Sequence, residues 1–131
     1  GACFMADLKQ FKEIGYFDPY TFLYFEEYII SEKAKKRSME IYYYPDAAVI
    51  HHHGASTGGS VNLVTRLANF KSESYMFSNY WIISKPKLRF IRLIRCFEVL
   101  YSFSKNKQFK DITVFFKQSR KILKETPRKE K

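Results

Sequence analysis

Apolar and polar positions follow two different patterns along the chain, and the first 58 residues mix strand and helix patterns. Residues 2–6 form an apolar run typical of a buried strand, and residues 8–14 repeat apolar side chains at helical spacing behind Asp7, a suitable N-cap. Residues 41–44 and 47–50 are rich in β-forming side chains and are separated by a turn. We therefore predict a small mixed α/β unit in this half.

An aromatic stretch, residues 20–25, leads into the acidic pair Glu26 and Glu27. The pair begins a predicted helix that runs to about Arg37, with acids in its first turn and bases in its last, as the helix dipole favours. A helix N-terminus also favours the ionised carboxylate, the form that accepts a proton. Two solvated acids that only favour a helix start remain the alternative.

Every element after residue 59 is predicted to be helical. A long helix is expected over residues 61–83, a second begins near Pro86, and a third covers about residues 107–125. The second helix carries an apolar stripe made of Phe90, Leu93, Ile94, Phe97, Leu100 and Tyr101. The third carries a stripe of Phe109, Ile112, Phe116 and Leu123 opposite Lys110, Lys117, Lys121 and Lys124.

Composition places the chain among ordinary globular proteins. Of its 131 residues, 46% are hydrophobic and 27% are charged, which excludes a disordered tail and a collagen-like repeat. Cys3 and Cys96, the two cysteines, fit neither a disulfide framework nor a zinc site, so we expect reduced thiols in the cytosol.

The net charge of +10 is concentrated in the second half of the chain. Up to Ser56 there are six basic and eight acidic residues, whereas from Thr57 onward there are 17 basic and five acidic residues. Such an asymmetry concerns binding partners rather than the fold. No apolar run approaches the ~18 residues needed to span a bilayer.

Several blocks of the first 58 residues occur in a characteristic order and spacing. They are residues 1–5, 14–18, 22–27, 41–47 and 49–56. Together they closely resemble the second half of the catalytic domain of family 2 glycosyltransferases, in the rhamnosyltransferase-like branch that builds bacterial surface polysaccharides. The resemblance implies an α/β fold, namely the C-terminal half of a nucleotide-diphospho-sugar transferase domain of the GT-A type, followed by a helical extension.

The same resemblance implies transfer of a sugar, with inversion, from a nucleotide-sugar donor to a glycan or lipid-linked acceptor. It assigns Glu27 as the general base and Glu26 as a supporting acid, and it places Tyr24 among the substrate-binding residues. The chemistry needs such a base because the acceptor hydroxyl must lose its proton as it attacks the anomeric carbon.

The resemblance also implies a divalent cation, Mn²⁺ or Mg²⁺, in the complete enzyme. It makes His51 a contact to the metal or the diphosphate, and His53 shares its face if the chain there is extended. Gly1 and Ala2 match positions where small residues let the backbone approach the donor sugar. Histidines facing solvent at the end of a strand, and a tight start to a strand, are the alternatives.

The sequence departs from the family pattern in one major respect. The nucleotide-binding half with its Asp-x-Asp motif is not found, and the aspartates are scattered along the chain. We therefore expect residues 1–58 to be the acceptor-side part of a catalytic domain that is inactive alone, with residues 59–131 as a basic, aromatic-rich extension. We expect a cytoplasmic protein that lies peripherally on the inner face of the cell membrane.

Two interpretations of the basic helical half stay open. Its aromatic stripes and basic faces fit an anionic membrane surface, but both stripes would equally form a core with the charges facing solvent. A non-catalytic module that binds nucleic acid or a partner chain is the alternative function, and nucleic acid is disfavoured because no such motif accompanies the aromatic and basic residues. Self-association is left open.

Overall fold

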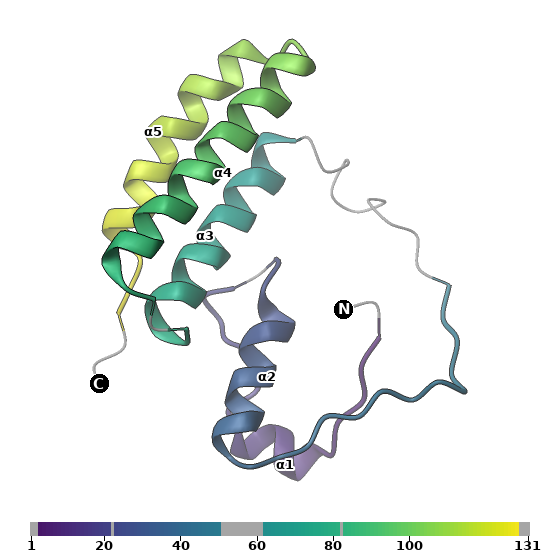
Figure 1. The fold of residues 1–131 in the computed structure, drawn as a ribbon. Helices are drawn as coiled ribbons and strands as arrows, with labels where there is room; N and C mark the ends of the chain where they lie inside the picture. Colours follow the sequence, from purple (N-terminus) through teal and green to yellow (C-terminus); the bar gives the residue numbers. More distant parts are fainter. Residues whose placement is uncertain (1–2, 22, 51–61, 82, 129–131) are drawn as a thin grey trace.

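A computed structural model describes residues 3–21, 23–50, 62–81 and 83–128, and within these ranges the chain is helical without a β-strand (Figure 1). The helices are α1 (Leu8–Glu13), α2 (Glu26–Lys36), α3 (Leu63–Asn79), α4 (Lys85–Lys105) and α5 (Phe109–Glu125). All five were expected from the sequence, with ends that differ by a few residues. None of the described helices combines the length and the apolarity needed to cross a membrane.

The predicted fold class is wrong, because the half of a GT-A type α/β domain expected over residues 1–58 has no sheet among its described residues. Residues 41–44 and 47–50 are extended but form no ladder, and Tyr43 and Ile50 are 87% and 91% exposed. Residues 3–6 are likewise exposed and do not pair with another strand. Residues with a high β-propensity form a strand only where a second strand pairs with their N–H and C=O groups. Within the described ranges no such partner lies beside them.

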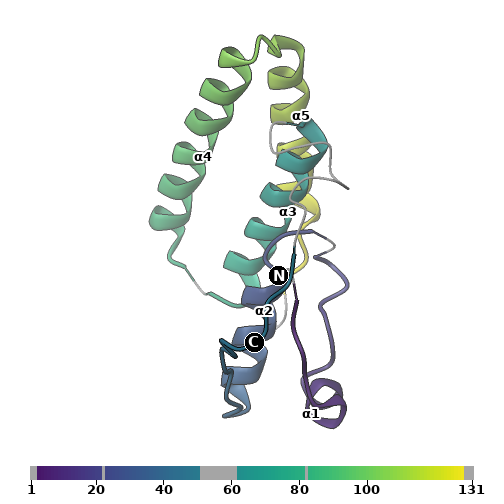
Figure 2. The same cartoon turned by 90° about the vertical axis from the view of Figure 1, so that its right-hand side faces the viewer.

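Helix α5 packs along α3 and also contacts α4, which diverges from them towards its N-terminal end (Figure 2), and α2 stands against one end of α3 (Figure 1). One core cluster joins the three long helices through Phe70, Val99, Phe103 and Phe115. A second cluster joins α2 to the C-terminal end of α3 through Ile29, Tyr75, Met76, Phe77 and Tyr80. Helix α3 therefore belongs to both cores, and its residues 72–77 are all buried.

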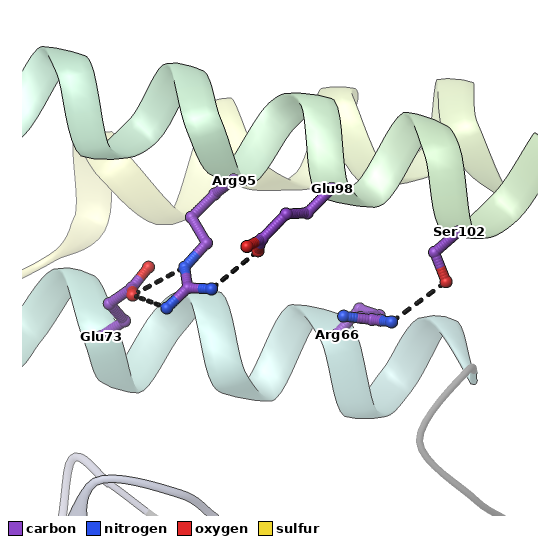
Figure 3. A network of polar contacts seen from close by, with 5 residues as sticks. All are labelled: Arg66, Glu73, Arg95, Glu98 and Ser102. Carbon is purple, nitrogen blue, oxygen red and sulfur yellow. Dashed lines mark hydrogen bonds and ion pairs between the residues drawn. The ribbon is translucent and has the colours of Figure 1, made fainter.

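A polar network crosses between α3 and α4 (Figure 3). The buried carboxylate of Glu73 accepts hydrogen bonds from Nε and Nη2 of Arg95 at 2.9 and 2.8 Å. Nη1 of the same guanidinium donates to Glu98 at 2.7 Å. Nearer the other end of the helix pair, Arg66 donates to the hydroxyl of Ser102 at 3.0 Å. Arg95 thus compensates the one acid that this helix pair buries in its interface.

Removal of this guanidinium tests the network. We expect Arg95→Met to lower the free energy of unfolding by about 1–2 kcal/mol, because Glu73 stays buried without its charged donor; the half-exposed position of Arg95 keeps the loss below that of a fully buried pair. Urea denaturation followed by circular dichroism measures it. Arg89→Met, at an exposed position on the same helix, is the matched control and should change stability by less than about 0.5 kcal/mol.

Candidate functional site

The chain ahead of the acidic pair is fixed to α3 by one buried carboxylate. Asp18 is 5% exposed, and its Oδ2 accepts hydrogen bonds from the hydroxyls of Tyr75 at 2.8 Å and Tyr80 at 2.6 Å. Its Oδ1 accepts from the backbone N–H of Tyr20 at 3.1 Å. Because buried polar groups are costly when unpaired, these bonds define where residues 18–21 lie on α3.

Further contacts hold the aromatic stretch along the same helix. The Tyr20 ring stacks on that of Tyr75, with centroids 4.4 Å apart. The hydroxyl of Ser72 donates to the backbone carbonyl of Leu23 at 2.8 Å, and Phe25 packs edge-on against Phe77. The segment that leads to the acids is therefore tied to α3 both before and after its midpoint.

The stretch ends in a strained turn. Tyr24 and Phe25 are consecutive residues in the left-handed region, with φ of 67° and 65°. This conformation costs a residue with a side chain about 1–2 kcal/mol, and two in succession are rare. Strained backbone of this kind persists only where surrounding contacts enforce it, and it is concentrated at functional sites. Here the strain immediately precedes the two acids.

Helix α2 begins directly after this turn, and its two acids differ in exposure. Glu27 is exposed, whereas Glu26 is half-buried. Successive residues of a helix point about 100° apart, so the two carboxylates cannot face the same direction. Among the described residues, the buried Oε2 of Glu26 has no hydrogen-bond partner. Glu27 thus lies at the surface, whereas Glu26 is turned towards the protein.

Of the residues proposed from the sequence, Tyr24, Glu26 and Glu27 lie among the described residues, as near neighbours in the sequence at the start of α2. Gly1, Ala2, His51 and His53 lie outside the described residues. Two hollows in the surface occur elsewhere, and neither includes an acid of the pair. One is lined by Arg66, Glu98, Tyr101, Ser102, Lys105 and Asn106, and the other by Val114, Lys117, Gln118, Arg120, Lys121 and Lys124.

A bound cation has no evident ligand set in the part of the chain that the structure describes. Within those ranges, no group of three or more His, Cys, Asp or Glu side chains converges closely enough to hold a metal. The aspartates and glutamates placed by the structure therefore do not fit a metal centre on their own, and no step of the chemistry below is assigned to one.

Sequence reasoning missed the role of Asp18. The sequence indicates only a turn at Phe17-Asp18-Pro19, and the bond from Tyr20 N–H to Asp18 agrees with a turn. The tyrosines that complete the site are 57 and 62 residues away in the sequence. Their spacing, five residues apart near the end of a helix, is the one local hint of a shared acceptor.

The Asp18 site makes stability sensitive to alkaline pH. Burial, and next the hydrogen bond to Asp18, raise the pKa of Tyr80 well above its ordinary value of 10.0. Below pH 10 the hydroxyl is protonated in both the folded and the unfolded chain, so its stabilisation is complete. Above pH 10 the unfolded chain loses this proton first, and stability falls as pH rises.

We therefore expect Tyr80→Phe to be less stable than the wild type by about 1.5–3 kcal/mol near pH 8, and this difference should shrink as pH rises above 10. Urea denaturation at pH 8 to 11 measures it, with the exposed Tyr101→Phe as control for titration of other groups. A difference that stays constant up to pH 11 would contradict the assignment.

The strain at Tyr24 has its own test. Alanine is ordinarily about 0.5–1 kcal/mol better than glycine because it loses less backbone entropy on folding. At a left-handed position this order reverses. Tyr24→Gly should therefore unfold at a higher urea concentration than Tyr24→Ala, with a free energy of unfolding larger by about 1 kcal/mol. Both variants lack the ring, which makes them a matched pair. Equal stabilities, or a more stable alanine variant, would show that residue 24 is not strained.

No family model, no curated protein and no solved structure matches the chain. The resemblance to family 2 glycosyltransferases therefore remains an interpretation of residue patterns. Support for a function comes from the chemistry and placement of Tyr24, Glu26 and Glu27.

Proposed function

We propose that the chain supplies the acceptor-side acidic pair of a glycosyltransferase, with Glu27 as the general base. The observation that carries this proposal is an exposed carboxylate in the first turn of α2, directly after a strained turn that α3 holds in place. An acid that only begins a helix does not require two left-handed aromatic residues before it. A base that must meet a hydroxyl at hydrogen-bond distance does require a fixed approach.

The reaction makes a definite demand on this carboxylate. An acceptor oxygen bonds to the anomeric carbon of the donor sugar while the bond from that carbon to the diphosphate breaks. The acceptor proton passes to Glu27, and the nucleoside diphosphate leaves with the bonding electron pair. The N-terminal end of α2 favours the carboxylate form that the step requires.

Glu26 and Tyr24 take supporting roles in this proposal. Glu26 is a positioning residue, because its half-buried side chain faces the protein and its buried Oε2 has no hydrogen-bond partner among the described residues. Tyr24 is half-buried at the turn and offers an aromatic ring to a sugar face. These assignments place the acceptor beside the start of α2.

Binding of the donor and its cation is proposed to involve other residues than the acidic pair. The resemblance makes His51 a contact to the divalent cation or to the diphosphate, with His53 as a weaker candidate. It assigns donor binding to a half whose pattern the sequence does not contain. We therefore expect turnover only where this chain acts together with a donor-binding half, in one polypeptide or in two.

A glutamine at position 27 tests the base. In the natural polypeptide that carries this sequence, Glu27→Gln should lower the turnover of sugar transfer by about 10²–10⁴-fold, the usual loss when a general base is removed. The KM for the nucleotide sugar should stay nearly unchanged, because the base does not contact the donor. Transfer from a panel of labelled nucleotide sugars to glycan and lipid-linked acceptors measures both.

Two further variants make the result specific. Glu27→Asp keeps a carboxylate one methylene shorter, the residue that the family often has, and should retain more activity than Glu27→Gln. Glu13→Gln removes an exposed acid at the end of α1 and should leave turnover unchanged. Glu27→Gln with more than half of wild-type turnover would refute the proposal.

A further inference from the structure

The apolar stripe of α4 is uncovered. Its exposed members lie at helical spacing along one face, and they are Phe90 (63% exposed), Leu93 (53%), Ile94 (43%), Phe97 (63%) and Tyr101 (71%). The face is about 16 Å long at 1.5 Å per residue. Figure 2 shows α4 at the edge of the molecule, where one side of the helix is free of other described elements. A contiguous apolar surface of this kind marks an interaction site.

The opposite side of α4 makes its contacts with the bundle. Val99 and Phe103 enter the core, and Arg95 binds Glu73 of α3. The corresponding stripe of α5 behaves differently, because Ile112, Phe116 and Leu123 pack on the core and only Phe109 stays exposed. The sequence left open whether the stripes pack or dock, and the structure separates the two helices. The apolar stripe of α5 packs on the core, and the apolar stripe of α4 stays exposed at the surface.

Basic side chains accompany the exposed stripe at both ends. Lys87 and Arg89 are exposed at its N-terminal end, and Lys105 is exposed at its C-terminal end. The one acid of α4, Glu98, is bound to Arg95. A further basic area is present on α5, where a hollow is lined by Lys117, Arg120, Lys121 and Lys124. The surface therefore attracts a partner that is both apolar and anionic.

We propose that the exposed face of α4 lies in the interface of an anionic lipid bilayer. Phe90, Leu93, Ile94 and Phe97 enter the boundary between headgroups and acyl chains, as in other amphipathic interfacial helices. Lys87, Arg89 and Lys105 bind lipid phosphates at the same depth. The proposal concerns a surface that does not include the acidic pair, and it does not depend on the role of Glu27.

A second copy of the chain fits this face less well. An antiparallel contact between two α4 stripes would bring Lys87 and Arg89 of one copy close to Lys105 of the other, and a parallel contact would bring like residues together. Either arrangement sets basic groups against basic groups and is unfavourable. An anionic headgroup layer neutralises these charges. Insertion into a bilayer also requires no groove of complementary shape on the protein.

Vesicle flotation tests the proposal with the full chain. We expect co-flotation with phosphatidylcholine vesicles that contain about one-third phosphatidylglycerol, little with phosphatidylcholine alone, and weakening as salt is raised. The exposed double substitution Phe90→Ser/Phe97→Ser should lower vesicle binding at least about ten-fold. The double substitution Tyr42→Ser/Tyr43→Ser removes two even more exposed rings from another segment and should leave binding unchanged.

Charge reversal provides the second arm. Lys87→Glu/Lys105→Glu should lower binding by more than about 25-fold, at about five-fold per basic group removed, whereas Lys9→Glu/Lys12→Glu on α1 should have little effect. Circular dichroism establishes that each variant keeps its helices. The proposal is overturned if the wild type does not float with anionic vesicles. It is also overturned if Phe90→Ser/Phe97→Ser floats like the wild type. A third contrary result would be a wild-type dimer, seen in sedimentation analysis, that Phe90→Ser/Phe97→Ser abolishes while neither protein binds lipid.

Discussion

A buried carboxylate is central to the contact between the first part of this chain and its helical bundle. Asp18 accepts hydrogen bonds from Tyr75 and Tyr80 of α3 and thereby attaches the first half of the chain to the helical bundle. The second core, formed by Ile29 and the C-terminal end of α3, includes the same two tyrosines. Contacts with α3 position α2 and the acids at its start, because the described residues before α3 form no sheet that could hold them.

This attachment also explains how strain is maintained near the acids. The left-handed turn at Tyr24 and Phe25 is unfavourable by itself, so contacts on both sides must compensate for it. Asp18 and Tyr20 supply them before the turn, while Phe25 packing on Phe77 supplies them within it. The α3 contacts thus offset part of the cost of the left-handed turn that precedes α2.

The second half of the chain contains two helices with similar apolar stripes, and the structure uses these stripes differently. Helix α5 uses its apolar stripe for the core and leaves lysines and arginines outside, whereas α4 enters the core by another side and leaves its stripe outside. On the side of α4 that faces α3, Arg95 forms an ion pair with the buried Glu73. A protein that acts on lipid-linked acceptors would benefit from the exposed stripe of α4, since it would bring the acidic pair near the membrane.

Local patterns predicted the helices well. The N-cap at Asp7 is observed as a bond from Gln10 N–H, Pro86 lies in the first turn of α4, and the acids of α2 stand at its start. Each of these features is decided by residues a few positions apart, which is why the sequence alone reveals it. The α/β fold was predicted incorrectly, because strands such as residues 41–44 depend on partners that local composition cannot supply.

By itself, the sequence determined where helices begin, how charge divides between the halves, and which acids stand at a helix N-terminus, since all of these depend on near neighbours. Only the tertiary structure decided that Asp18 binds tyrosines some sixty residues away, that Glu26 and Glu27 face different surroundings, and that the stripe of α4 rather than that of α5 stays exposed. The physical reason is that burial and hydrogen bonding between distant segments depend on how helices dock, and an amphipathic pattern does not specify which of its sides will be covered.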